Sequence, residues 1–241
     1  FSPDGKMLAV GMFEDYQEAI IEFWNTSNWQ LVDIPVNYYS APIEDSNSFS
    51  FSPDGKTLIY STDGDSIVLW NLADGTTINP ASESFGYGFN VVAISPDGKT
   101  VAGGGYYGLL YLWDAATGKI LHILQERDLR IESLVFSTDG MNLISGSIDG
   151  IRIWDISTGE MVNSALNHAS FGKIISISPD GKRLATLRAD EVIVWDAASG
   201  SQLQAFSGHN YAAFSPDWSL LATVQPDDQV LLIYDIASGQ L

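Results

Sequence analysis

The sequence predicts an all-β fold made of six similar units, and three observations lead to that prediction. A six-residue phrase, FSPDGK, recurs in identical or related form from Phe1, Phe51, Ile94, Phe136, Ile177 and Phe214. A second phrase, which ends in an aromatic residue followed by Asp or Asn, comes after each copy of the first. Apolar residues at helical spacing are missing from every window of 11 or more residues.

The first phrase is typical of a tight turn between two strands. Pro sets φ for the first central position, Asp can bond the local backbone, and Gly supplies the positive φ that closes the hairpin. Apolar residues flank the turn on both sides, as in SLVFSTDGMNLISGS from Ser133. This pattern predicts strand, turn and strand in every unit.

The second phrase marks a later strand of each unit and sets the period. It reads IEFWN, IVLWN, LYLWD, IRIWD, VIVWD and LIYD, and its aromatic residues are Trp24, Trp70, Trp113, Trp154, Trp195 and Tyr234, spaced 46, 43, 41, 41 and 39 residues apart. A further turn follows the last five copies, at Asp74-Gly75, Thr117-Gly118, Thr158-Gly159, Ser199-Gly200 and Ser238-Gly239. Each unit is therefore expected to hold four short strands.

A period near 42 residues with four strands per unit is typical of a β-propeller blade. With its Trp-Asp phrases, the chain resembles the WD-repeat family, in a bacterial form, over essentially its whole length. The resemblance implies one propeller domain over 1–241, with units of approximately 1–40, 41–82, 83–125, 126–166, 167–207 and 208–241. The third strand of such a blade is buried on both faces, so we expect the six phrase aromatics to be core residues.

The resemblance also implies a hydrogen-bonded structural tetrad of His, Ser or Thr, Asp and Trp. Only the fifth unit has all four members, at His168, Thr186, Asp190 and Trp195. The fourth unit keeps Ser145, Asp149 and Trp154 but has Arg127 in the position of the histidine. We therefore interpret His168 as a structural hydrogen-bonding residue rather than a catalyst.

The chain begins at the tail of a first strand and stops where the fourth strand of the sixth unit should begin. We therefore expect incomplete first and last blades in a fragment of a longer chain, whose full ring has about seven blades. A six-bladed ring that closes imperfectly is the alternative.

Composition narrows the classes of partner. The chain has 11 Lys and Arg against 30 Asp and Glu, a formal net charge of −19, which disfavours nucleic acids and anionic membranes. The acidity either serves solubility or attracts a basic partner. Cysteine is absent, so disulfides and thiolate chemistry are excluded, and no apolar run reaches membrane-spanning length. These features do not indicate a compartment.

No catalytic residue, metal site or cofactor is predicted. The GGGYYG segment at 103–108 does not end in Lys followed by Ser or Thr, and we interpret its glycines as a tight hairpin. The STDGDS segment at 61–66 lacks most ligands of a calcium loop. Neither a zinc-protease motif nor a nucleophile elbow occurs. We therefore predict a protein that is not an enzyme.

The loops at the end of the blades opposite the SPDGK turns suggest a partner-binding patch. Aromatic residues and carboxylates gather there in the first three units, at Glu14, Asp15, Tyr16, Tyr38, Tyr39, Phe85, Tyr87, Phe89, Tyr106 and Tyr107. Exposed aromatics on a rigid frame are typical of protein-binding hot spots. The alternative is that these rings cap their own blades.

The predicted function is a non-catalytic scaffold for a protein or peptide, possibly a basic one. Two alternatives stay open. The propeller could be a sensor or a substrate gate attached to a catalytic domain, such as a kinase or peptidase, outside this chain. It could also bind a small molecule or sugar in a central channel.

Overall fold

The structure, a computed structural model, describes residues 1–14, 18–32, 34, 49–62, 66–79, 88–125, 129–147, 150–163, 173–178, 180–197, 199–207, 211–215, 217–225 and 230–241. The chain divides into two compact units, Phe1–Ile131 and Glu132–Leu241. The boundary falls at the first residue of a strand, so that strand is assigned below to the second unit with the rest of its sheet.

The first unit contains three sheets. The first sheet has β1 (Met7–Glu14), β2 (Glu18–Asn25) and β3 (Gln30–Leu31); the second has β4 (Phe49–Phe51), β5 (Thr57–Thr62), β6 (Ser66–Asn71) and β7 (Thr77–Ile78). The third has β8 (Phe89–Ile94), β9 (Thr100–Gly105), β10 (Leu109–Asp114) and β11 (Ile120–Gln125), with a 3-10 turn, η1 (Tyr106–Gly108), between β9 and β10.

The second unit also contains three sheets. They are β12 (Ile131–Phe136), β13 (Asn142–Ser147), β14 (Gly150–Asp155) and β15 (Met161–Asn163); β16 (Lys173–Ile177), β17 (Arg183–Arg188), β18 (Glu191–Asp196) and β19 (Gln202–Ser207); and β20 (Tyr211–Phe214), β21 (Leu220–Gln225) and β22 (Val230–Asp235).

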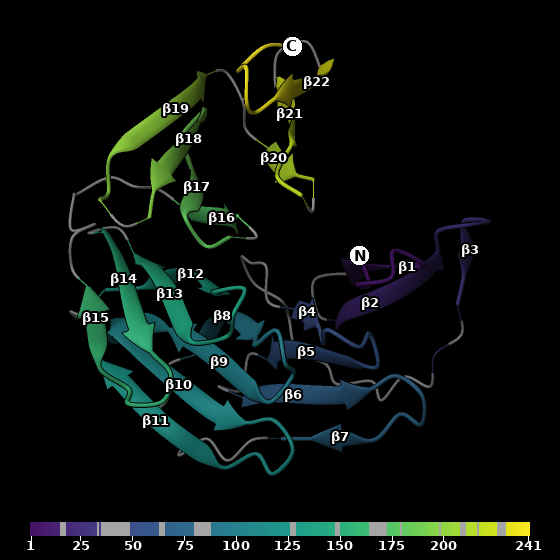
Figure 1. Cartoon of the computed structure of the whole chain (residues 1–241). Coiled ribbons are helices and arrows are strands. Elements are labelled where there is room, and N and C mark those ends of the chain that lie inside the picture. The colour runs from purple at the N-terminus through teal and green to yellow at the C-terminus, as the bar shows by residue number, and fades with distance from the viewer. Residues whose placement is uncertain are drawn as a thin grey trace. The chain divides into compact units, whose positions relative to one another are not determined.

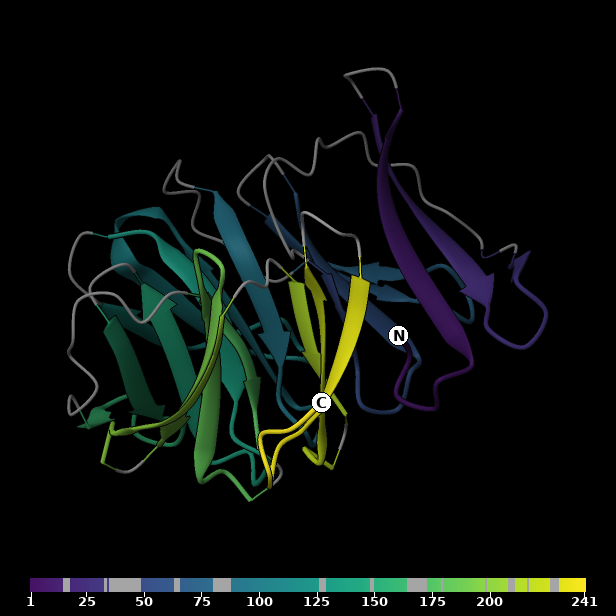
Figure 2. The ribbon, with the colours of Figure 1, turned by 90° about the horizontal axis from the view of Figure 1, so that it is seen from above.

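Every sheet is an antiparallel meander in which each strand pairs with the next one along the chain, as Figures 1 and 2 show. Four of the sheets have four strands, and the first and last have three among the described residues. Each sheet falls inside one of the six predicted units, and the described residues contain no α-helix. The predicted all-β fold of antiparallel propeller blades is confirmed.

The core lies between neighbouring sheets of each unit and is built mainly from the third strands. Trp113 is fully buried, and Trp70 and Trp154 are nearly so. The ring of Phe23 in β2 meets that of Trp70 in β6 edge to face, with 5.5 Å between centroids. Trp24, Trp195 and Tyr234 are only half-buried. These six aromatics therefore differ in burial from blade to blade.

Three of the four glycines of the GGGYYG segment belong to a strand, and only Gly108 lies in the turn of the β9–β10 hairpin, where its φ is 69°. The interpretation of the glycines as a tight hairpin therefore holds for Gly108 and is corrected for the other three. Gly103, Gly104 and Gly105 lie in β9, and the turn itself is made by η1. A Cβ on Gly103 would collide with the Ile67 side chain, and one on Gly104 would lie 2.7 Å from Cγ2 of Ile131. The glycines let apolar side chains of neighbouring strands pack directly on the backbone.

The SPDGK turns have one geometry, which is centred on the serine, a residue with no predicted role in the turn. In the second sheet, the Ser52 hydroxyl donates to Oδ1 of Asp54 at 2.6 Å and accepts from the backbone N–H of Thr57 at 2.9 Å. The same two bonds recur at Ser2, Ser95, Ser137, Ser178 and Ser215. Positive φ at Gly55 confirms the conformation predicted for the turn.

One turn replaces glycine with tryptophan. Trp218 has φ of 59° yet is 3% exposed, and its ring stacks on Phe214 with 4.2 Å between centroids. Its indole N–H donates to the Ser176 hydroxyl of the neighbouring sheet at 2.9 Å. These contacts offset the unfavourable backbone conformation and join the last two sheets of the second unit.

We expect the free energy of unfolding to fall as the pH drops below about 4. The serine hydroxyl bonds, together with backbone N–H groups, hold the pKa of each turn aspartate below its usual value, and that of Asp217 falls to about 2. Such carboxylates stabilise the fold above the unfolded pKa, and the contribution is lost as the pH falls through the folded pKa. Urea unfolding measured at neutral pH and at about pH 3 tests this.

The matched control is Ser178→Ala, which removes the largest cause of the lowered pKa of Asp180. It should lower stability at neutral pH by about 1–3 kcal/mol, because Ser178 is buried, and should also flatten the pH dependence. Equal pH dependence in both proteins would show that the turn carboxylates do not carry the effect.

Candidate functional site

Most of the predicted aromatic patch lies outside the described residues. Glu14 ends β1, where its backbone pairs with Glu18. Phe89, Tyr106 and Tyr107 belong to the third sheet. The other predicted members fall outside the described residues: Asp15, Tyr16, Tyr38, Tyr39, Phe85 and Tyr87.

Phe89 packs into the core of its own sheet. Its ring meets those of Tyr111 and Trp113 edge to face, at centroid distances of 5.6 Å and 5.4 Å. It is also in contact with the buried cluster around Val92 and Val101. The capping alternative therefore describes Phe89 better than partner binding does.

Tyr106 and Tyr107 are placed differently, because the η1 turn carries them away from the core. Their exposed fractions are 44% and 49%. Tyr107 has φ of 62°, a left-handed conformation that few large residues adopt, and its carbonyl accepts a hydrogen bond from Nε2 of Gln125 at 3.0 Å. The turn thus presents two adjacent aromatic side chains in a defined position.

Arg130 completes this cluster, although no sequence pattern predicted it as a site residue. Its guanidinium carbon lies 5.3 Å from the centroid of the Tyr106 ring, within range of a cation–π interaction. Its Nε is buried and has no hydrogen-bond partner in the part of the chain that the structure describes. Arg130 lies 24 residues after Tyr106 in the sequence, so no local pattern links the two residues.

The structure brings together two members of the predicted tetrad. Trp195 Nε1 donates to Thr186 Oγ1 at 2.9 Å, and Asp190 is exposed in the turn between β17 and β18. In the fourth unit, Trp154 Nε1 donates to Ser145 Oγ at the same distance. His168 and Asp149 lie outside the described residues.

Two other sheets lack one partner of this bond. Thr223 in the last sheet is equivalent to Thr186 in the fifth. Each threonine lies two residues after a leucine that pairs with the aromatic residue of the second phrase, Trp195 or Tyr234. The aromatic there is Tyr234, and the buried Thr223 hydroxyl has no hydrogen-bond partner among the described residues. In the second sheet the equivalent position is Tyr60, and the indole N–H of Trp70 is buried without a partner.

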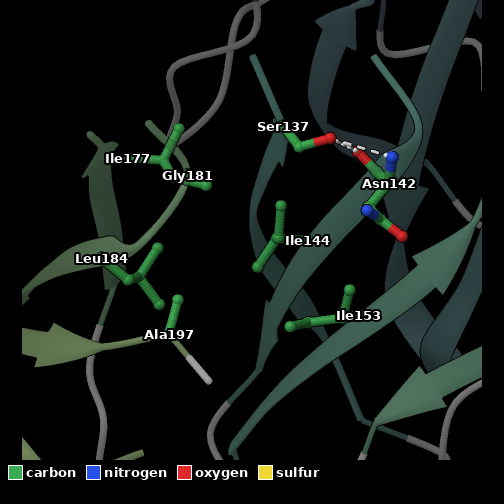
Figure 3. Close-up of a pocket in the computed structure, with 8 residues that line it drawn as sticks. All are labelled: Ser137, Asn142, Ile144, Ile153, Ile177, Gly181, Leu184 and Ala197. Carbon is green, nitrogen blue, oxygen red and sulfur yellow. Dashed lines mark hydrogen bonds between the residues drawn. The ribbon is translucent and has the colours of Figure 1, made fainter. Parts of the chain in front are cut away.

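A small cavity lies between the fourth and fifth sheets, at the end that carries the SPDGK turns. Figure 3 shows Ser137, Asn142, Ile144 and Ile153 on one side of it and Ile177, Gly181, Leu184 and Ala197 on the other. Its volume is about 70 Å³, and four large aliphatic side chains line it. This space is therefore small and mainly apolar.

A larger cavity, of about 300 Å³, lies at the equivalent place between the second and third sheets. We call it the blade 2–3 cavity; it is lined by Ser52, Pro53, Asp54, Thr57, Leu69, Ile94, Asp97, Gly98, Ala115 and Ala116. Six of these positions correspond to lining residues of the smaller cavity, for example Gly98 to Gly181 and Ala115 to Ala197. The two carboxylates have no counterpart in the lining of the smaller cavity.

The described part of the chain contains no group of three or more His, Asp or Glu side chains arranged to hold a metal ion. No helix in this part of the chain is long and apolar enough to cross a membrane.

Comparison with known proteins identifies a repeat family. The family described as "WD domain, G-beta repeat" matches residues 84–114 and 118–155. The first match runs through β8, β9 and β10, and the second runs from β11 to β14, so that each match ends at a Trp-Asp pair. No curated protein matches the chain.

The tetrad bond gives a prediction with opposite outcomes at two equivalent sites. Thr186→Val should lower the free energy of unfolding by about 1–3 kcal/mol, because it leaves the indole N–H of Trp195 without its acceptor. Thr223→Val should be neutral or stabilising, because it removes a buried hydroxyl that has no partner. Urea unfolding of both variants tests this, and equal losses would contradict it.

Proposed function

We propose that this chain is a non-catalytic scaffold of the WD-repeat β-propeller type. Propellers of this family commonly hold other proteins, and rigid sheets that present loops suit that role. The proposed site is the tyrosine cluster, defined as Tyr106, Tyr107 and Arg130, at the end of the third sheet opposite the SPDGK turns.

The exposure of two adjacent tyrosines on a fixed turn carries this proposal. Tyr and Arg are enriched in interface hot spots because they combine a large apolar area with hydrogen-bonding tips. Tyr107 is a non-glycine residue at positive φ, a strained backbone conformation. Residues in such conformations are found preferentially at functional sites. Neither tyrosine belongs to a buried cluster of the third sheet, in contrast to Phe89.

The proposed partner is a protein or peptide that is basic overall. A net charge of −19 attracts a positively charged partner at long range and speeds its association. The same charge repels nucleic acids and anionic lipid surfaces.

We expect Tyr106→Ala with Tyr107→Ala to weaken partner capture while changing stability by no more than about 1 kcal/mol. The matched control is Leu121→Ala with Ile123→Ala on β11 of the same sheet, where the two side chains are 45% and 50% exposed. Affinity capture followed by mass spectrometry, with the wild-type chain and both variants as baits, makes the comparison.

A protein lost only with the tyrosine variant supports the proposed site. Equal capture by all three baits would remove the tyrosine cluster from consideration. Loss of folding in the tyrosine variant would instead favour the alternative in which these rings cap their own blade.

A further inference from the structure

We propose that the blade 2–3 cavity binds the side chain of a lysine from a partner protein, with its methylenes inside and its ammonium between the carboxylates of Asp54 and Asp97. This site shares no residue with the tyrosine cluster and lies at the other end of the sheets. The proposal therefore does not depend on the one made above.

The cavity has the size and lining for an aliphatic stem. Its volume of about 300 Å³ is at the lower end of ligand pockets in proteins. Leu69, Ile94 and Ala115 supply apolar walls, and Pro53 adds another. Lysine side chains bury their methylenes against such surfaces while the charged end stays at the rim.

The two aspartates place negative charge at the rim. Both side chains belong to exposed turn residues. The hydroxyl of Ser52 and the backbone N–H of Lys56 keep the pKa of Asp54 below its usual value, and Ser95 and Lys99 act in the same way on Asp97. Both groups are therefore ionised at neutral pH, and an ammonium ion would meet them without a change of protonation.

The turn geometry favours lysine over arginine. Oδ1 of Asp54 and Oδ1 of Asp97 already accept the serine hydroxyl and a backbone N–H. Each carboxylate therefore has mainly its second oxygen, Oδ2, available to a ligand. This disfavours the bidentate hydrogen bonding that a guanidinium prefers. An ammonium has three rotatable donors on a point charge and can use single oxygens from two carboxylates.

A lysine of the chain itself does not block the rim strongly. Lys99 Nζ lies 3.5 Å from Oδ2 of Asp97, but the two side chains are 80% and 55% exposed. Surface ion pairs of this kind contribute little to stability, so an incoming ammonium with buried methylenes can displace it. Lys56 is also an exposed residue, and its backbone rather than its ammonium bonds Asp54.

The test uses three short probes and the full chain. Acetyl-Gly-Lys-Gly-amide, its norleucine analogue and its arginine analogue are titrated into ¹⁵N-labelled protein, and amide shifts are followed by NMR. The lysine peptide should move the amides of Gly98, Ala115 and Ala116. The norleucine peptide, which keeps the four-carbon chain but lacks the ammonium group, should not move them. The arginine peptide should bind more weakly than the lysine peptide.

The decisive variant is Asp54→Asn with Asp97→Asn, which keeps an oxygen for the turn bonds but removes both charges. It should weaken binding of the lysine peptide by at least about 5-fold. The control, Asp139→Asn with Asp180→Asn, makes the same change in two SPDGK-type turns whose aspartates do not line the smaller cavity. It should leave the affinity unchanged.

A second variant keeps the proposal testable if the first does not fold. Ala116→Leu adds an aliphatic side chain at the cavity without removing a side-chain hydrogen bond, and it should also abolish the shifts of Gly98 and Ala115. Equal weakening by both aspartate pairs would overturn the proposal, as would equal shifts from the norleucine peptide. Equal binding of the arginine peptide would overturn the assignment to lysine.

Discussion

The hydrogen bond from the serine hydroxyl to the aspartate in each SPDGK turn is the interaction on which the rest of the structure depends. It fixes the aspartate, whose Oδ1 then accepts a backbone N–H, while the serine accepts a second N–H from the start of the next strand. Backbone groups that a tight turn would leave unpaired are thereby satisfied. The register of the first two strands follows from this arrangement, and with it the side of the sheet that each side chain occupies.

Repetition of this turn also determines how neighbouring sheets meet within a unit. The Cβ position of Gly55 lies 3.6 Å from Cδ of Pro3, and that of Gly98 lies 3.8 Å from Cδ of Pro53. The proline of one turn thus comes close to the glycine of the next turn. Thr138 replaces this proline in the fourth sheet, and no heavy atom lies within 4 Å of the Cβ position of Gly181. Small changes in one phrase therefore alter the space between two sheets.

Buried polar groups vary more than the turns do. Trp195 and Trp154 each donate to a hydroxyl on the neighbouring strand, whereas Trp70 and Thr223 each lack the matching partner. An unpaired buried polar group destabilises the folded state, so the sheets contribute unequally to stability. Apolar contacts between sheets, such as the edge-to-face contact of Phe23 with Trp70, offset part of this cost.

The sequence by itself determined the strands, the turns and the six-unit organisation, because each depends on local chemistry repeated at a fixed spacing. Turn glycines require positive φ, apolar runs such as IVLWN form buried strands, and both signals lie within a few residues of one another. The resemblance to the WD-repeat family also implied that Trp195 and Thr186 are partners, and their side chains are hydrogen-bonded.

Only the tertiary structure decided which side chains meet across sheets and strands that are distant in the sequence. Phe89 packs inward and Tyr106 is 44% exposed although both were predicted for one patch, because Phe89 lies in strand β8 and Tyr106 in the η1 turn. Arg130 lies over the ring of Tyr106. Asp54 and Asp97, which are 43 residues apart in the sequence, line the same cavity. Contacts of this kind depend on how two sheets pack against each other. A repeat pattern in the sequence does not predict the space that remains between the packed sheets.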